Sequence, residues 1–434
     1  MSMKKIFILP ALVLVIFTFK SFSQATSSAI TLKASRLMYQ NILKTIKDDI
    51  KNKYFDSNLG GVDIEGNSKK AGDLINEAKS IEEMADIIAR FLYPFNDSHL
   101  FFMPPSKTTT VEYGWEMMFV GDKVFITKVE EDSDAYKKGV RVGDQIYMVE
   151  GYIPARPEFW MFRYHFNILR PQPVLSVILI KPSGNKFKVE LQAKVTRDSV
   201  FMPSRRDRIL EYETRYQEKT RQLFSDDVPG LAIWKMQSFE LTELQVDKMM
   251  DKARKNEALI LDLRSNEGGY YSSLAQLASN FFASKITVGE IKERKGLSKM
   301  VIEPRGKNIF NGKLVVLIDS DSASAAELFA RIIQLEKRGT VIGDQSSGAV
   351  MASVVYQYEF GLDTKIPYAL SLTVADLTMK DGQRLEKIGV APDEKILPTA
   401  ADLANKRDPV LARAAEILGF KMTPEQAGAI FAKK

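Results

Sequence analysis

The chain has 434 residues, of which 45% are hydrophobic and 27% are charged, and its formal net charge is +6. This length predicts two or three domains with sizeable cores, and so mild a positive charge gives no reason to expect a nucleic-acid partner. The chain has no cysteine, which excludes disulfides, a thiolate metal site and a lipidated N-terminal cysteine. We expect neither a metal ion nor a cofactor.

Residues 1–23 have the pattern of a signal peptide. Two lysines precede an almost wholly apolar run between residues 6 and 19, and Ser21 and Ser23 supply the small residues of a cleavage site. A membrane-spanning helix needs roughly 20 apolar residues, so an uncleaved anchor is the lesser alternative. We therefore expect an exported chain, periplasmic or secreted, that begins at Gln24 after cleavage. Its only expected membrane contact is through the leader before cleavage. Removing the leader, which holds three lysines and no acidic residue, lowers the net charge from +6 to +3.

Residues 24–108 are predicted to form a helical domain. Apolar residues recur at helical spacing between Tyr39 and Ile50 and again between Ile81 and Leu92. Between these two runs, residues 56–67 are rich in Gly, Asn and Asp and are predicted to be a loop.

The helical segment ends with the pair Ser98-His99. His99 is one of only two histidines in the chain. Taken alone, such a residue can be a packed structural imidazole or an acid-base group, and the pattern does not decide between them. The other histidine, His165, lies in the aromatic helical stretch Trp160 to Phe166, and we expect it to have a packing role.

Residues 109–196 are predicted to form a small β domain. Alternating strand patterns occur at residues 123–129, 144–151, 174–180 and 186–191, and residues 133–144 between the first two have a helix-and-turn pattern. This order resembles a PDZ domain, a module that captures extended peptides by strand addition. The loop at Gly114 and Trp115 is the expected site for a peptide carboxylate, although the second glycine familiar there is missing. The alternative is a domain that only separates its neighbours.

Residues 197–434 are predicted to form an α/β domain, because buried-strand runs alternate with helical ones. Strand patterns occur at residues 230–236, 258–264 and 314–318, and the amphipathic stretch 408–418 is predicted to be the last helix packed on this domain. A charged helical stretch, residues 205–221, leads into the domain.

Within this domain, Ser324 lies between a predicted strand and a predicted helix. Free backbone N–H groups at the start of that helix could hold a developing oxyanion. A serine at such a helix start is therefore well placed to be the nucleophile of a hydrolase. Ser324 and Glu327 also fit the capping box of an ordinary helix, so a plain N-cap is the alternative. After the strand 258–264, Gly268 and Gly269 allow the backbone to approach a substrate closely.

These runs, followed by Gly389-Val390-Ala391-Pro392-Asp393, resemble the C-terminal processing (tail-specific) proteases and the tricorn protease core. The resemblance covers nearly all of the chain after residue 30. It implies a crotonase-like catalytic domain of repeated β-β-α units, an N-terminal helical segment and an inserted PDZ-like domain. It also implies a serine endopeptidase that acts on peptides or unfolded proteins.

The chain departs from the better-known members of this family at one catalytic position. Their serine works with a lysine that follows a strand and a Gly-Glu turn, and here that position is Ala349, which cannot take a proton. The resemblance therefore implies the tricorn-like arrangement. In it, Ser324 is the nucleophile, His99 is the general base, Ser98 is the hydroxyl next to the base, and Glu386 is the acid that orients it.

The same resemblance implies an oxyanion hole made by the backbone N–H groups of Ala325 and of Gly268 or Gly269. Two alternatives remain open: a peptide-binding relative whose catalysis has decayed, and a carrier whose aromatic stretch 160–166 lines an apolar-ligand site. The presence of Ser324, Ser98 and His99 together favours the protease. The sequence gives no oligomeric state and no cleavage preference.

Overall fold

The computed structural model describes residues 32–105, 109–197, 217, 220–306, 308–361 and 365–431. The predicted signal peptide and most of the charged stretch 205–221 lie outside the described residues. Among the helices that the structure does describe, none combines the length and the apolar character needed to cross a membrane.

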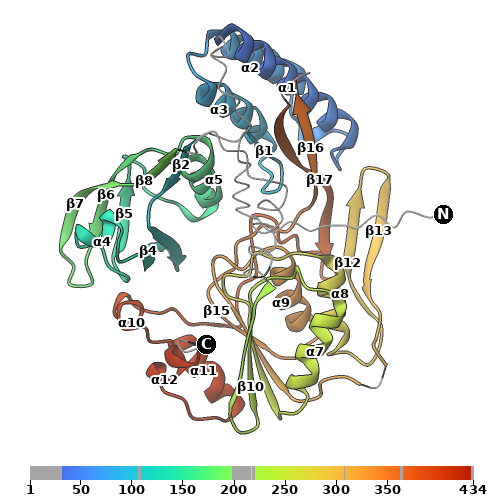
Figure 1. Cartoon of the computed structure of the whole chain (residues 1–434). Helices are drawn as coiled ribbons and strands as arrows, with labels where there is room; N and C mark the ends of the chain where they lie inside the picture. The colour runs from blue at the N-terminus through green and yellow to red at the C-terminus, as the bar shows by residue number, and fades with distance from the viewer. Residues whose placement is uncertain are drawn as a thin grey trace.

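Three helices form a layer at the N-terminal end of the described chain (Figure 1). They are α1 (Leu32–Lys53), α2 (Ile64–Glu77) and α3 (Ile81–Leu92), with 3-10 turns at η1 (Leu59–Gly61) and η2 (Tyr93–Phe95). Both predicted apolar faces are buried, except for Ile81 at the start of α3, which is exposed. The predicted end of the loop 56–67 is wrong, because α2 already begins at Ile64. The Asp63 side chain accepts a hydrogen bond from Gly66 N there, and this N-cap outweighs the low helix propensity of the local sequence.

The helical layer packs on a five-stranded sheet built from both ends of the chain. Its strands are β1 (Phe101–Met103), β12 (Ile286–Glu293), β13 (Gly296–Ile302), β16 (Ala352–Phe360) and β17 (Ile366–Met379). The order is β1-β17-β12-β13, and β16 also pairs with β17. Tyr368, Leu370 and Leu372 of β17 share one hydrophobic cluster with α1, α2 and α3. The N-terminal helices therefore share their core with strands that are almost 300 residues away in the sequence.

A six-stranded sheet forms the centre of the C-terminal part. Its strands are β9 (Gln222–Val228), β10 (Leu231–Met236), β11 (Ala258–Asp262), β14 (Lys313–Ile318), β15 (Thr340–Gly343) and β18 (Glu394–Lys395). The order is β18-β15-β14-β11-β10-β9, and all neighbours are parallel except the β9–β10 pair. The predicted strands of this domain are thus confirmed.

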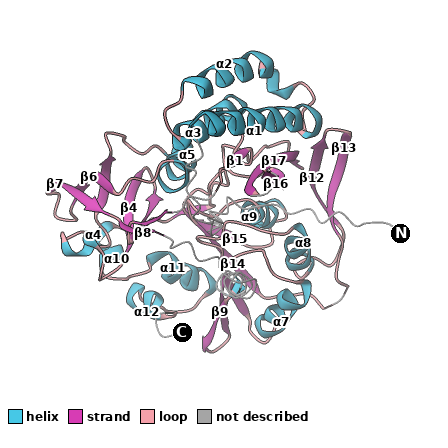
Figure 2. Ribbon diagram, turned by 45° about the horizontal axis from the view of Figure 1, so that its top comes forward, coloured by secondary structure: helices cyan, strands magenta, loops and turns pink. Residues whose placement is uncertain are grey.

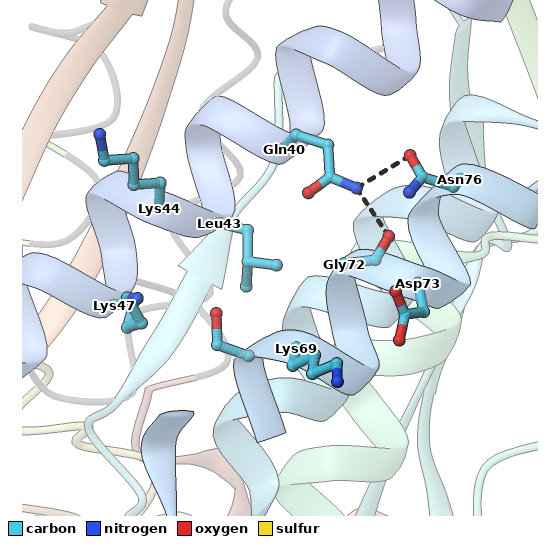
Figure 3. Close-up of a pocket in the computed structure, with 9 residues that line it drawn as sticks. Gln40, Leu43, Lys44, Lys47, Lys69, Gly72, Asp73 and Asn76 are labelled. Carbon is cyan, nitrogen blue, oxygen red and sulfur yellow. Dashed lines mark hydrogen bonds between the residues drawn. The ribbon is translucent and has the colours of Figure 1, made fainter. Parts of the chain in front are cut away.

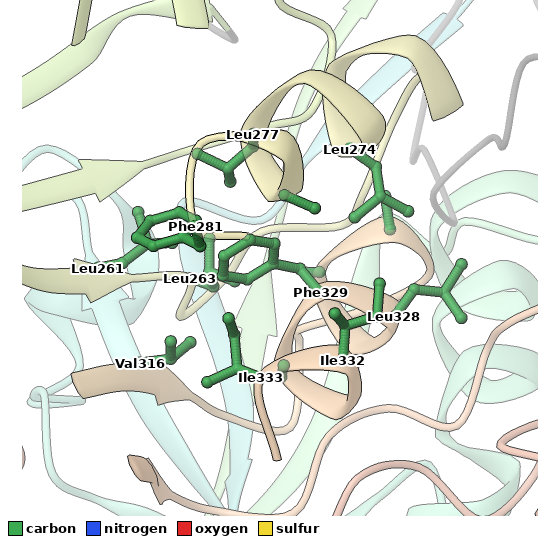
Figure 4. Packing of buried hydrophobic residues seen from close by; sticks show 14 of the residues in the cluster. Leu261, Leu263, Leu274, Leu277, Phe281, Val316, Leu328, Phe329, Ile332 and Ile333 are labelled. Carbon is green, nitrogen blue, oxygen red and sulfur yellow. The ribbon is translucent and has the colours of Figure 1, made fainter. Parts of the chain in front are cut away.

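Helices cover both faces of this sheet, and the alternation of side chains along each strand explains why (Figure 2). On one face lie α7 (Glu243–Ala253), α8 (Tyr271–Ser279) and α9 (Ala325–Leu335), and on the other lie α11 (Pro409–Leu418) and α12 (Pro424–Ala429). The short helix α10 (Ala400–Ala404) lies against Gly143 instead. Leu261 and Val316 point to the face covered by α7, α8 and α9, whereas Ile260 and Val315 point to the face covered by α11. Figure 4 shows α8 and α9 packed on the first face around Phe329.

The remaining described strands form an antiparallel sheet, which we call the β module (residues 109–197). They are β3 (Trp115–Val120), β4 (Lys123–Val129), β5 (Gln145–Val149), β6 (Val174–Ile180) and β7 (Lys186–Gln192), in that order across the sheet. Short elements complete the module: β2 (Thr109–Glu112) paired with β8 (Lys194–Arg197), α4 (Asp134–Lys137), η3 (Arg156–Glu158), α5 (Phe159–Tyr164) and a π-helical turn η4 (His165–Leu169). The four predicted strands are confirmed, and β3 is an additional strand.

His165 lies in the helical part of the β module. Its ring contacts the edge of Phe166, with centroids 5.1 Å apart, and Nδ1 lies 3.7 Å from a carboxylate oxygen of Asp86 on α3. These contacts agree with the packing role that we expected.

Candidate active site

Ser324 stands between β14 and α9 in an unusual backbone conformation. Its φ is +55° and its ψ is −118°, whereas an ordinary N-cap residue is extended. Its side chain is fully buried, and Oγ has no hydrogen-bond partner among the described residues. Ser324 is therefore not an ordinary N-cap, and strained conformations of this kind cluster at functional sites.

The carboxylate of Glu327, in the first turn of α9, connects this turn to the loop after β15. It is fully buried and accepts hydrogen bonds from Ser324 N (2.9 Å), Ser346 Oγ (2.6 Å), Gly348 N (2.7 Å) and Ala349 N (3.0 Å). Burial raises the pKa of Glu327 to about 7, although the four donors counteract this effect. The sequence pattern indicated only a capping role for Glu327, and its contacts with the later loop lie outside what a local pattern can predict.

The two glycines after β11 bring backbone directly against Ser324. A Cβ atom added at Gly268 would lie 2.6 Å from Ser324 Cβ and 2.9 Å from Ala325 N, so only glycine fits there. Gly269, with φ +145°, lies against the backbone of Phe239. The Gly268 N–H donates to Asn266 Oδ1 at 2.8 Å.

Ser98, His99 and Glu386 meet although 288 residues separate the first from the last. Ser98 Oγ lies 2.8 Å from His99 Nδ1 and donates to Glu386 Oε2 at 3.0 Å, and Ser98 N donates to Glu386 Oε1 at 3.1 Å. Only 7% of the Glu386 side chain is exposed, so Glu386 is not a solvated surface residue. Burial, followed by the charge of Asp97, raises the pKa of Glu386 to about 7.

The backbone of His99 is held by two polar side chains, one from the preceding loop and one from β17. His99 is 1% exposed; its backbone N–H donates to Asp97 Oδ1 at 2.9 Å, and its backbone carbonyl accepts from Ser371 Oγ of β17 at 2.6 Å. Asp97 also accepts from Tyr54 Oη and Thr373 Oγ1, each at 2.9 Å. Sequence reasoning missed Asp97, although an acidic residue directly before Ser98-His99 was a signal for it.

The contacts around Ser324 and the contacts around Ser98 and Glu386 are joined at residues 349 and 350. Ser324 N donates to Ala349 O at 2.9 Å, and the next residue, Val350, donates its N–H to Glu386 Oε2 at 2.8 Å. One hydrogen-bonded network therefore contains Ser324, Ser98, His99 and Glu386. Since Ser324 Oγ has no hydrogen-bond partner among the described residues, no hydrogen bond joins it to the imidazole.

Gly114 and Trp115 are not part of this network. They lie at the start of β3, where Gly114, with φ +70°, accepts a hydrogen bond from Glu130 N at 2.8 Å. The β module nevertheless contacts the loops near Ser324 through two arginines. Arg163 binds both carboxylate oxygens of Asp321 at 3.1 Å, and Arg156 donates to Asp344 and, at 2.7 Å, to Gln345 O.

A hollow of about 330 Å³ lies elsewhere, between α1 and α2. Gln40 crosses it, donating to Gly72 O at 2.6 Å and to Asn76 Oδ1 at 3.1 Å (Figure 3). It contains none of the network residues. In the described ranges, no cluster of three or more His, Asp or Glu side chains could hold a metal ion.

Known proteins resemble parts of this chain in sequence and most of it in fold. The family described as peptidase family S41 matches residues 230–396. The tail-specific protease of Haemophilus influenzae is 29% identical over 218 residues, which cover 48% of this chain and 30% of that protein. The carboxy-terminal processing protease CtpA of Bacillus subtilis is 26% identical over 285 residues, covering 65% and 55%. The chain thus spans about half the length of these relatives or less.

Among solved structures, mature CPAF complexed with lactacystin matches with a TM-score of 0.65 and 14% identity, over 92% of this chain and all of that one. A second structure of mature CPAF matches with the same TM-score over 85% of this chain and 94% of that one. At this identity the likeness concerns the fold, a mixed α/β architecture.

We expect Glu327→Gln to lower the free energy of unfolding by about 2–4 kcal/mol, because an amide group leaves buried N–H donors without an acceptor. Urea unfolding at pH 8, where most of the carboxylate is ionised, measures this. The matched control is Glu359→Gln, which removes a surface glutamate paired with Lys365, and we expect it to stay within about 0.5 kcal/mol. Equal stability of the two variants would contradict the central role of Glu327.

Proposed function

Because this chain belongs to peptidase family S41, we propose that it is a serine endopeptidase that hydrolyses peptides or unfolded proteins. The observation that carries the proposal is the hydrogen-bonded network that contains Ser324, Ser98, His99 and Glu386. In the proposed site, Ser324 is the nucleophile and His99 the general base.

The hydrogen bonds around Ser98 determine which nitrogen of His99 can act. The Ser98 hydroxyl has one proton and donates it to Glu386 Oε2, so the 2.8 Å contact with His99 Nδ1 requires a proton on Nδ1. This leaves Nε2 unprotonated and able to accept the Ser324 proton. Ser98 and Glu386 then stabilise the imidazolium that forms, as the acid of a catalytic triad does.

In the proposed reaction, Ser324 Oγ attacks the scissile carbonyl carbon while its proton passes to His99 Nε2. The imidazolium then gives that proton to the leaving amine as the peptide bond breaks. A water molecule, deprotonated by the same nitrogen, then attacks the acyl-enzyme. As the acyl bond breaks, the imidazolium gives this proton to Ser324 Oγ. This sequence needs no lysine at position 349.

The Ala325 N–H at the start of α9 is the first proposed oxyanion donor, because it lies in the positive first turn of the helix. Of the two glycines, Gly269 is the better second donor, since the Gly268 N–H is already bonded to Asn266. Gly268 contributes by its lack of a side chain, which keeps the space beside Ala325 N open.

The aromatic stretch 160–166 gives little support to an apolar-ligand carrier. Phe162 and Phe166 pack together in the β module with ring centroids 4.7 Å apart, and Arg163 binds Asp321. A decayed peptide-binding relative is also less favoured, because Ser98, His99 and Glu386 are still joined by hydrogen bonds.

We also propose the finer features that the family resemblance implies. The catalytic domain, residues 197–434, is crotonase-like; residues 24–108 form the helical domain; and residues 109–196 form a PDZ-like domain that binds substrate peptide near Gly114 and Trp115. Residues 1–23 are proposed to direct export to the periplasm or the medium.

We expect a fluorophosphonate to label this protein on Ser324 alone, because among the serines that the structure describes only Ser324 combines the strained turn with the helix N-terminus. Mass mapping of the adduct checks this, with Ser324→Ala as the unlabelled control. An adduct on Ser322 or Ser347 would move the nucleophile to another residue.

We expect His99→Ala to lower turnover by about 10²-fold or more, because a general base contributes roughly 10²–10⁴-fold. Wild-type activity should also fall as the pH drops through the imidazole range, near an unperturbed pKa of about 6.5, since only neutral His99 accepts a proton. Steady-state peptide hydrolysis between pH 5 and 9 measures both. His165→Ala is the matched control, and loss of activity in it but not in His99→Ala would refute the assignment.

We expect Trp115→Ala to weaken binding of a decapeptide with a free C-terminal carboxylate several-fold, since Trp115 adjoins the proposed carboxylate loop. Calorimetry on the Ser324→Ala background measures binding without cleavage. The same peptide as a C-terminal amide is the control and should bind weakly to either form. Equal affinity for acid and amide would show that the module does not capture carboxylates.

A further inference from the structure

Lys387 stands directly beside the acid of the proposed site, in a constrained position. Its Nζ lies 3.8 Å from Glu386 Oε1, and 27% of its side chain is exposed. Its φ is +66°, which is unfavourable for a residue with a side chain, and its N–H donates to Gly348 O at 2.7 Å. The ammonium also lies 5.1 Å from the ring centroid of Trp160, on α5 of the β module.

Glu386 needs this neighbour because its other surroundings disfavour a charged carboxylate. The side chain is almost fully buried, and Asp97 adds a like charge. The charged or titratable groups that act on Glu386 are Asp97, Lys387 and, through Ser98, the His99 imidazole. Lys387 is the cation of this set: burial lowers the pKa of its ammonium group, and the charges of Glu386 and Asp97 oppose that shift.

The hydrogen bonds that Glu386 makes favour its ionised form. Its two oxygens accept from Ser98 N, Ser98 Oγ and Val350 N. Hydrogen bonds to a charged carboxylate are stronger than those to a neutral carboxyl group, so ionisation strengthens all three contacts. The strength with which Glu386 holds Ser98, and through it the imidazole, therefore depends on the charge of Glu386.

We propose that Lys387 is a positioning residue whose ammonium group keeps Glu386 ionised, so that Ser98 and His99 stay oriented toward Ser324. This role rests on the proposed function and adds a residue to it. Lys387 acts through Glu386 and does not exchange a proton with the substrate. The Trp160 ring holds the ammonium in place from the β module, by a cation–π contact.

The test compares Lys387→Met with Lys387→Arg over pH 5–9. Loss of the positive charge favours the protonated form of Glu386 and, directly, the imidazolium form of His99. Both effects lower activity at acid pH. We expect the acid limb of kcat/KM in Lys387→Met to move upward by about one pH unit, with roughly tenfold loss below the limb and recovery near pH 9. Lys387→Arg keeps the charge and should restore the wild-type limb.

A matched control is Lys365→Met, which removes an exposed lysine paired with Glu359 at 2.8 Å and should leave the profile unchanged. An unshifted limb in Lys387→Met would overturn the proposal. A loss of equal size at every pH, with Lys387→Arg equally impaired, would also overturn it and indicate a packing role.

A readout without catalysis separates this proposal from the proposed function. Carboxyl-carbon NMR reports the ionisation of Glu386 directly, and the signal that is missing from the Glu386→Gln protein identifies this residue. We expect its titration midpoint to rise in Lys387→Met and to stay at the wild-type value in Lys387→Arg, and an unchanged midpoint in Lys387→Met would overturn the role of Lys387. If this midpoint rises while the wild type fails to react with fluorophosphonate, the peptidase proposal fails and the electrostatic role of Lys387 stands.

Discussion

The buried carboxylate of Glu327 is the constraint on which the candidate site depends. A carboxylate without water around it is unfavourable unless several donors surround it, and here Ser324 N, Ser346 Oγ, Gly348 N and Ala349 N converge on its two oxygens. This convergence fixes the loop after β15 against the first turn of α9. Ser324 can therefore keep an unfavourable backbone conformation, because the contacts around it outweigh the local strain.

The position of Asp97 and His99 depends on β17, which connects the five-stranded sheet with the layer of N-terminal helices. This strand pairs with β1, β12 and β16, and its side chains fill the core under α1, α2 and α3. Ser371 and Thr373 on β17 bind the His99 carbonyl and the Asp97 carboxylate. The backbone of His99 is thus positioned by a strand that precedes Glu386 by few residues, and this arrangement keeps the proposed base and its proposed acid in one frame.

Much of the fold around Ser324 could be predicted because buried strands are short apolar runs and α9 has a helical apolar period. The start of α2 could not be predicted, since its residues have the composition of a loop. A single side chain, that of Asp63, determines where the helix begins. β3 was missed because its burial does not alternate clearly. The roles of Glu327 and Glu386 depend on contacts with residues distant in the sequence, and no local pattern distinguishes such a glutamate from a cap or a surface residue.

The long separation between Ser98 and Glu386 has a consequence for the nascent chain. Closing a loop of 288 residues has an entropic cost that only the completed tertiary contacts offset, so the pair cannot form until the strand and turn near residue 386 have been synthesised. A ribosome-bound chain or a C-terminally truncated fragment would contain Ser324 in its turn but an unoriented imidazole. The proposed hydrolytic activity would then belong to the finished molecule alone, and this would protect unfolded neighbours, and the chain itself, during synthesis.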